Sequence, residues 1–204
     1  HGCDWSSDVC SSDLAEQIHT DTVLVVTKQH IGQGAKKYSE AIKATDALIT
    51  NVPDIPLMLY FADCVPVFIV DPVQKVIGIA HAGWKGTLDK IAQKTVLAMQ
   101  AHFGTNPQQC LVGIAPSIGP CCYEVDDVVI NRLKGEFEKW EELVRPDGNK
   151  WYLDLWQANC LQLQQIGVQS KNIVVSNVCT ACNKELFFSY RAENGCTGRM
   201  GAVI

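Results

Sequence analysis

Two short apolar runs separated by a polar turn dominate the pattern of hydrophobic and polar positions along the chain. Residues 65–70 and 76–80 are rich in β-branched side chains, which is typical of buried strands. Residues 71–74, Asp-Pro-Val-Gln, have turn composition, because proline presets φ and aspartate favours the first turn position. The sequence therefore predicts a hairpin, and folding it about the middle of this turn places Cys64 directly opposite His81.

The remaining apolar segments alternate between strand and helix patterns. Strands are predicted at residues 22–27, 46–50, 110–115 and 172–176. Helices are predicted from the cap Thr87 to Phe103, from the cap Asp126 to Leu143, and from the cap Asp154 to Ile166, with Gly104 and Gly167 as stops. The tail, residues 187–199, alternates apolar and polar positions and turns on Asn-Gly, which predicts a second hairpin. This order favours an α/β (α+β) fold, a single domain with a mixed sheet and flanking helices.

Composition narrows the class of protein. A chain of 204 residues with 47% hydrophobic content can bury one core, so one domain is expected. The net charge of −5 argues against nucleic acid or an anionic membrane surface as a partner. No stretch approaches the roughly 18 apolar residues of a membrane span. Ten cysteines without a secretory signal indicate reduced thiols, so we expect a cytoplasmic protein, with a monomer favoured.

The first residues depart from this pattern. Residues 1–14 are polar, serine-rich and without periodicity, and they lack the basic start and apolar core of a signal peptide. Residues 4–14 resemble the in-frame translation of a sequencing-adapter oligonucleotide. We therefore interpret 1–14 as a non-native segment and 15–204 as a single domain that lacks its N-terminal part.

The Cys64 and His81 pair allows two interpretations. Cysteine is among the most buried residue types, so both side chains could be ordinary core residues. The following residues 81–86, His-Ala-Gly-Trp-Lys-Gly, favour a functional site, because two glycines around a ring and a cation indicate a tight loop with close backbone approach. Opposed on one face of a hairpin, the thiol and imidazole could share a metal ion or a proton.

Several motifs, in order, give the chain a specific resemblance. They are Ala62-Asp63-Cys64 with Pro66, residues 81–86, Gly113 to Gly119, Cys122 to Val125, Phe188 to Arg191, and Thr197-Gly198-Arg199. Together they resemble the YfiH/laccase-domain family from about Gln17 to the C-terminus. Its members are described as purine nucleoside phosphorylases, were earlier labelled multicopper polyphenol oxidases, and are also called peptidoglycan editing factors. The resemblance implies the YfiH-like fold, which is related to the cysteine-hydrolase-type deamidase domain of cytotoxic necrotizing factor (CNF).

The family resemblance implies a metal centre. Its Gln-x-His motif maps the third ligand to His19, beside Cys64 and His81, which are also the implied catalytic residues. Two imidazoles and one thiolate suit Zn²⁺, with Cu²⁺ as an alternative, and three protein ligands leave one coordination position for water or substrate. The implied activity is phosphorolysis of adenosine, inosine and S-methyl-5′-thioadenosine, with adenosine deaminase activity, so the implied partners are small purine nucleosides and phosphate.

Substrate contacts are predicted at five further positions. The planar guanidinium groups of Arg191 and Arg199 suit phosphate, although ordinary surface arginines are commoner. Trp84 is a candidate for stacking on the purine, and Lys85 and Ser189 lie in the same motifs as candidate substrate or phosphate contacts.

The same residues are also compatible with three other functions. A metal-free Cys64–His81 dyad would make a cysteine hydrolase or transferase, because a nearby imidazole activates a thiolate. A non-enzymatic role in peptidoglycan editing would need metal binding without turnover. A copper-dependent polyphenol oxidase is the weakest alternative, because laccase-type copper needs many histidines and the chain has five.

Four other cysteines fall into two pairs. Cys121 and Cys122 are adjacent, a spacing that makes a shared metal ion difficult, so we expect packing or loop thiols. Cys179-x-x-Cys182 has the spacing of a zinc knuckle or a redox pair. A structural zinc site usually needs a second such pair and none stands at matching spacing, so packing is favoured here too.

Overall fold

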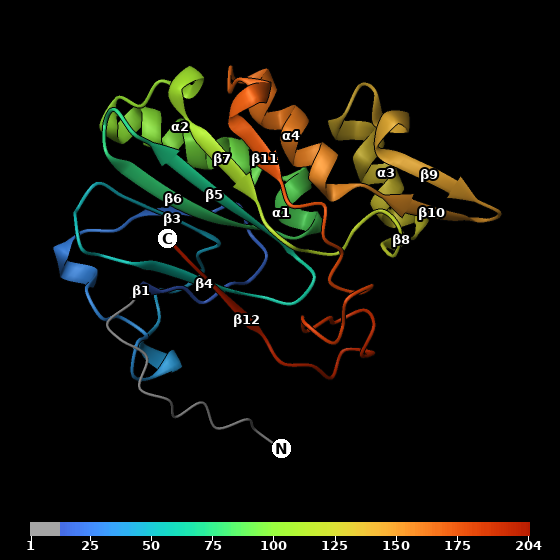
Figure 1. Cartoon of the computed structure of the whole chain (residues 1–204), viewed down its shortest axis with the longest axis horizontal. Coiled ribbons are helices and arrows are strands. Elements are labelled where there is room, and N and C mark those ends of the chain that lie inside the picture. Colours follow the sequence, from blue (N-terminus) through green and yellow to red (C-terminus); the bar gives the residue numbers. More distant parts are fainter. Residues whose placement is uncertain (1–12) are drawn as a thin grey trace.

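A six-stranded mixed sheet forms the middle layer of the computed structural model, which describes residues 13–204 (Figure 1). Its strand order is β11-β7-β5-β6-β3-β2. The strands are β2 (Val23–Val25), β3 (Ala47–Thr50), β5 (Val65–Asp71), β6 (Val76–Ala82), β7 (Leu111–Ile114) and β11 (Ile173–Val175). The β2–β3 and β7–β11 pairs are parallel and the other pairs are antiparallel. The predicted mixed sheet with flanking helices is thus confirmed.

Both faces of this sheet are covered. Helices α1 (Trp84–Leu88), α2 (Ile91–Phe103) and α4 (Leu155–Gln165) lie on one face, and a three-stranded sheet of β1 (Asp13–Leu14), β4 (Leu57–Phe61) and β12 (Met200–Val203) lies on the other (Figure 1). Along β3 the side chains alternate, so Ile49 joins the core under the helices and Leu48 joins the core against β4. Burial on both faces explains why β3 reads as a continuous apolar run.

A smaller unit extends beyond the edge of the sheet. It contains α3 (Asp127–Glu136) and the strands β8 (Glu124–Val125), β9 (Val144–Asp147) and β10 (Lys150–Leu153), which form the second three-stranded sheet (Figure 1). The described residues also contain five short 3₁₀ helices: Lys28–His30, Tyr38–Glu40, Pro107–Gln109, Trp140–Leu143 and Ser170–Asn172. No helix among the described residues is long and apolar enough to cross a membrane.

Two of the three predicted helix caps are confirmed. The side chain of Asp126 accepts the Val129 N–H at 3.1 Å, and that of Asp154 accepts the Gln157 N–H at 2.9 Å. The predicted cap at Thr87 is wrong. Thr87 lies inside α1 and its hydroxyl donates to a backbone carbonyl, and the chain then turns at Lys90, whose φ of 63° is left-handed, before α2 begins.

Two further predictions are wrong, the end of one helix and the hairpin in the tail. The helix that follows Asp126 ends at Glu136 rather than Leu143, because Phe137 is extended. The predicted hairpin over residues 187–199 is absent, and this segment forms turns, with left-handed φ values at Asn194 and Gly195. The last strand begins afterwards and pairs with β4. The predicted non-native segment 1–14 lies outside the described residues except for β1.

The predicted β5–β6 hairpin is present, but its predicted register is wrong by two residues. His81 pairs with Pro66, not with Cys64. The side chain of Asp71 accepts two backbone N–H groups of the turn, and Lys75 adopts a left-handed φ of 54°, so the loop holds four residues. Because side chains alternate with a period of two, a shift of two keeps Cys64 and His81 on the same face.

We predict that Ile79→Ala lowers the free energy of unfolding by about 2–5 kcal/mol, because it leaves a cavity between the two sheets. Ile79 is fully buried in the core against β4. Val174→Ala is the matched control, since Val174 is 68% exposed, and its effect should stay within about 0.5 kcal/mol. Urea denaturation measures both, and equal effects of the two substitutions would contradict the three-layer packing.

Candidate functional site

Three side chains that are far apart in the sequence meet at one end of the central sheet. His19 precedes β2, Cys64 precedes β5, and His81 lies near the end of β6. One ligand atom from each lies within 4.8 Å of the other two, and the Cys64 Sγ is 3.9 Å from the His19 Nε2. The two imidazole ring centroids are 4.9 Å apart. The structure therefore brings together all three predicted metal ligands.

A buried carboxylate orients this group. Asp46 is fully buried, and its Oδ1 lies 2.9 Å from the Nδ1 of His81. The same carboxylate accepts the backbone N–H groups of Ile18, His19 and Thr20 at 3.2, 3.1 and 2.8 Å. Since Nδ1 of His81 is engaged with Asp46, its Nε2 is left for a metal ion or a proton. This is the carboxylate–histidine arrangement that supports metal ligands in proteins.

The backbone of His19 is in an unfavourable conformation. Its φ of 63° lies in the left-handed region, which costs a non-glycine residue on the order of 1–3 kcal/mol. The hydrogen bond from its own N–H to Asp46, with those of its two neighbours, holds it there. Asp46 therefore positions both imidazoles, one through its ring and the other through its backbone.

Cys64 and His81 shift each other's pKa in opposite directions. Burial alone would raise the pKa of the Cys64 thiol, but the charge of His81 and hydrogen bonds from both histidines lower it to about 6. Burial alone would lower the pKa of His81, but the Cys64 thiolate and the Asp46 hydrogen bond raise it to about 9. Without a metal ion the pair is thus a thiolate beside an imidazolium near neutral pH.

Gly83 gives the cysteine its space. A Cβ at this position would lie 2.9 Å from the Cys64 Sγ and 3.2 Å from the Cδ2 of His19. Residues 81–86 are not the predicted loop, because α1 begins at Trp84 directly after Gly83. The close backbone approach that their glycines predicted is nevertheless present. With two imidazoles and one thiolate converging, the donor set fits a single Zn²⁺ or Cu²⁺ ion.

These three residues border a cavity of about 830 Å³. Four cationic side chains line it, those of Lys36, Lys85, Arg191 and Arg199, although the chain as a whole is acidic. Four aromatic side chains also line it: Tyr60, Trp84, Tyr123 and Tyr190. A positively charged, aromatic-lined cavity can bind an anionic group together with a flat ring.

Four of the five predicted substrate contacts line this cavity. Arg191 packs over the Tyr123 ring at 5.2 Å and donates from Nη1 to the Glu124 carbonyl at 2.8 Å. The side chain of Arg199 donates from Nη1 to the backbone carbonyls of Thr197 and Gly198, its neighbours in the sequence. Ser189 lies apart from the lining. It is fully buried, and its hydroxyl accepts the N–H of Ala192 at 3.1 Å, which shapes the loop that carries Arg191.

Sequence reasoning missed the residues that support the site. Asp46 stands at the start of a predicted strand, where a charged residue before a buried run was the available signal. Asp63 is 7% exposed and accepts the Thr180 hydroxyl and the Arg191 N–H, both at 2.6 Å. Asp63 directly precedes Cys64 and has a left-handed φ of 78°. Lys36 came from a segment with no apolar period, so no pattern pointed to it.

The fold and this site define a known family. Residues 6–204 match the family model described as multi-copper polyphenol oxidoreductase laccase. The chain therefore belongs to this family, as its motifs predicted.

Individual relatives carry a different name. The chain is 41% identical to the purine nucleoside phosphorylase YlmD of Geobacillus stearothermophilus, over 93% of this chain and 70% of that protein. It is 39% identical to the Bacillus subtilis protein of the same name, over 98% and 72%. The crystal structure of the hypothetical protein YfiH of Bacillus licheniformis superposes with a TM-score of 0.89 at 41% identity, over 94% and 73% of the two chains.

We predict that iodoacetamide alkylates Cys64 of the metal-free chain with a pH midpoint near 6, set by its lowered pKa. Free glutathione, labelled under the same conditions, serves as the reference thiol, because an unperturbed cysteine has a pKa of about 8.5. Asp46→Asn removes the charge that raises the pKa of His81, so the Cys64 midpoint should rise. Peptide-level mass spectrometry after timed labelling measures the alkylation of Cys64, and a Cys64 midpoint equal to that of the reference thiol would contradict the thiolate–imidazolium pair.

Proposed function

We propose that this chain is a zinc-dependent purine nucleoside phosphorylase that acts on adenosine, inosine and S-methyl-5′-thioadenosine. We include an adenosine deaminase side activity in the proposal. The names of relatives that are about 40% identical support the phosphorylase activity. The observation that carries the proposal is the single cavity wall that combines two histidines and a thiol with four cationic side chains.

The size and lining of the cavity suit these substrates. A volume of about 830 Å³ lies within the range of small-molecule sites and can take a nucleoside beside a phosphate. The rings of Trp84 and Tyr190 offer surfaces for the purine. Arg191, Arg199 and Lys85 offer donors for the phosphate oxygens, and each arginine has N–H groups beyond those engaged with backbone carbonyls.

The roles of the residues follow from their positions. When bound by His19, Cys64 and His81, zinc would supply a Lewis acid with one open coordination position. In phosphorolysis a phosphate oxygen forms a bond to the ribose C1′ as the C1′–N9 bond breaks, and the electron pair and a proton go to the purine. Arg191 and Arg199 would hold the phosphate in line for this attack, while Asp46 keeps both histidines in place.

A second function is favoured by one specific observation. The lowered pKa of Cys64 beside His81 is the arrangement that activates a nucleophilic thiol, so a metal-free cysteine hydrolase is the alternative. A multicopper oxidase fits less well, because only His19 and His81 among the described histidines join the donor set. In a non-enzymatic role in peptidoglycan editing, the cationic, aromatic-lined cavity would bind a ligand without converting it.

We predict that Cys64→Ser and His19→Ala each lower phosphorolysis of inosine more than about 100-fold and remove one bound zinc per chain, because each deletes a ligand. His102→Ala is the matched control, since His102 lies at the end of α2 away from the cavity. Purine release with and without phosphate gives the activity, and elemental analysis gives the metal. Full activity in a zinc-free chain would contradict the metal proposal and favour the cysteine hydrolase.

We predict that Arg199→Met raises the KM for phosphate by on the order of 10-fold to 100-fold, the loss of one charged hydrogen bond worth about 1.5–3 kcal/mol. The KM for inosine should change far less. Arg145→Met is the matched control, because Arg145 is an exposed arginine on β9 in the smaller unit. Initial rates at varied phosphate measure both variants. An unchanged KM for phosphate in Arg199→Met would remove Arg199 from the phosphate site.

A further inference from the structure

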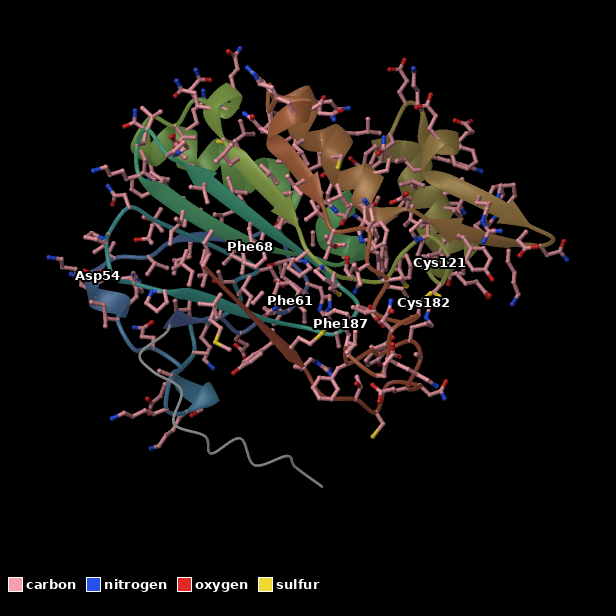
Figure 2. The ribbon with its side chains drawn as sticks, in the orientation of Figure 1. Asp54, Phe61, Phe68, Cys121, Cys182 and Phe187 are labelled. Atoms are coloured by element: carbon pink, nitrogen blue, oxygen red, sulfur yellow. The ribbon has the colours of Figure 1, made fainter. Side chains whose placement is uncertain are left out.

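A second cluster of metal-ligating side chains lies outside the cavity lining. It consists of Cys121, Cys122, Cys179 and Cys182, here called the four-thiol cluster, whose sulfur atoms all lie within 4.8 Å of one another. Cys121 and Cys122 follow β7, and Cys179 and Cys182 follow β11 (Figure 2 labels Cys121 and Cys182). The parallel pairing of β7 and β11 brings the ends of these strands together. The fold therefore supplies the second cysteine pair that sequence spacing did not reveal.

The four sulfur atoms lie close enough together to share one tetrahedral ion. Four thiolates at a Zn–S distance of about 2.3 Å would be separated by about 3.8 Å along each tetrahedral edge. The Cys182 Sγ lies 3.5 Å from that of Cys121 and 3.4 Å from that of Cys122. A disulfide between any two of these residues would use two sulfurs and leave two thiols beside it. A single metal ion would use all four.

The backbone explains how adjacent cysteines can face one point. The N–H groups of Cys122 and Tyr123 both donate to the Gly119 carbonyl at 3.0 Å, which closes a helix-like turn. Successive side chains in such a turn diverge by about 100° rather than pointing to opposite sides as in a strand. This turn allows Cys121 and Cys122 to approach the same sulfur of Cys182, although they are adjacent in the sequence.

Backbone groups also support the opposite pair. The Gly119 N–H donates to the Cys179 Sγ at 3.2 Å, a contact that favours a thiolate at this position. A Cβ at Gly119 would lie 3.2 Å from the Cβ of Cys179, so only glycine fits this close approach comfortably. The side chain of Asn183 fixes the loop by donating to the Cys179 carbonyl at 2.8 Å.

We propose that the four-thiol cluster binds one structural zinc ion as a tetrathiolate. Four protein ligands fill a tetrahedral shell and leave no position for substrate, so the ion is structural rather than catalytic. The bound ion joins the loop after β7 to the loop after β11. Thr180 lies between Cys179 and Cys182 and donates its hydroxyl to the Asp63 carboxylate at 2.6 Å, and the backbone N–H of Arg191 donates to the same carboxylate at 2.6 Å. Because Asp63 and Arg191 line the cavity, the joined loops support the cavity wall.

The test uses the whole 204-residue chain with Cys64→Ser, which removes the thiolate of the cavity. This chain as purified under reducing conditions should hold one zinc per chain. After replacement of zinc by Co²⁺, it should show intense thiolate-to-cobalt charge transfer and the visible d–d bands of a tetrahedral tetrathiolate. The further substitutions Cys121→Ser and Cys182→Ser should abolish both signals. Cys64→Ser with Cys196→Ser is the matched control and should keep them.

Two results would overturn the proposal. One is a Cys64→Ser chain that is folded by circular dichroism and takes up no cobalt with thiolate charge transfer. The other is a disulfide within the four-thiol cluster in the reduced preparation, detected as a loss of two hydrogens in peptide mass spectra. Both measurements use an intact cluster, so they decide the question even if the serine variants fail to fold. Neither depends on nucleoside phosphorolysis.

Discussion

The hydrogen bonds of one buried carboxylate hold the candidate site together. Burial alone would raise the pKa of Asp46, but hydrogen bonds from His81 and Thr20 outweigh it and hold the pKa below its ordinary value. Asp46 therefore stays charged inside the protein, where an uncompensated charge would be costly. It joins the segment before β2 to the end of β6, and these are the two places from which the histidines come.

The layered sheet turns this local arrangement into a cavity wall. Cys64 and Gly83 lie at the open end of the β5–β6 hairpin, and the missing side chain of Gly83 leaves room for the sulfur. Left-handed backbone at His19 and Asp63 stores strain at the same place, and hydrogen bonds to the buried carboxylate of Asp46 and from the buried hydroxyl of Thr180 hold it. Strain held by its surroundings in this way is typical of functional sites.

Local patterns predicted much of this structure. The apolar runs predicted the strands of the central sheet, and Asp126 and Asp154 predicted the starts of two helices, because these features depend on neighbouring residues. The register of the β5–β6 hairpin was missed because it depends on the side chain of Asp71 and the left-handed Lys75 in the turn. The end of α3 was likewise set by one extended residue.

The candidate site shows the same division. Motifs pointed to His19, Cys64 and His81, but only the fold showed that Asp46 positions the two histidines. The four-thiol cluster was missed for a related reason, since its two halves are about 60 residues apart and meet only through the β7–β11 pairing. Residues that act through long-range contacts leave no periodic or spaced signal in a single sequence.

The central claim is that three distant side chains share one metal ion under the control of Asp46. Anomalous diffraction at the zinc edge, from crystals of the purified chain, tests it directly. The account predicts a peak about 2.0–2.1 Å from a nitrogen of His19 and of His81 and about 2.3 Å from the Cys64 Sγ. A map in zinc-containing crystals with no peak there, and with the His19 ring turned away from Cys64, would contradict it.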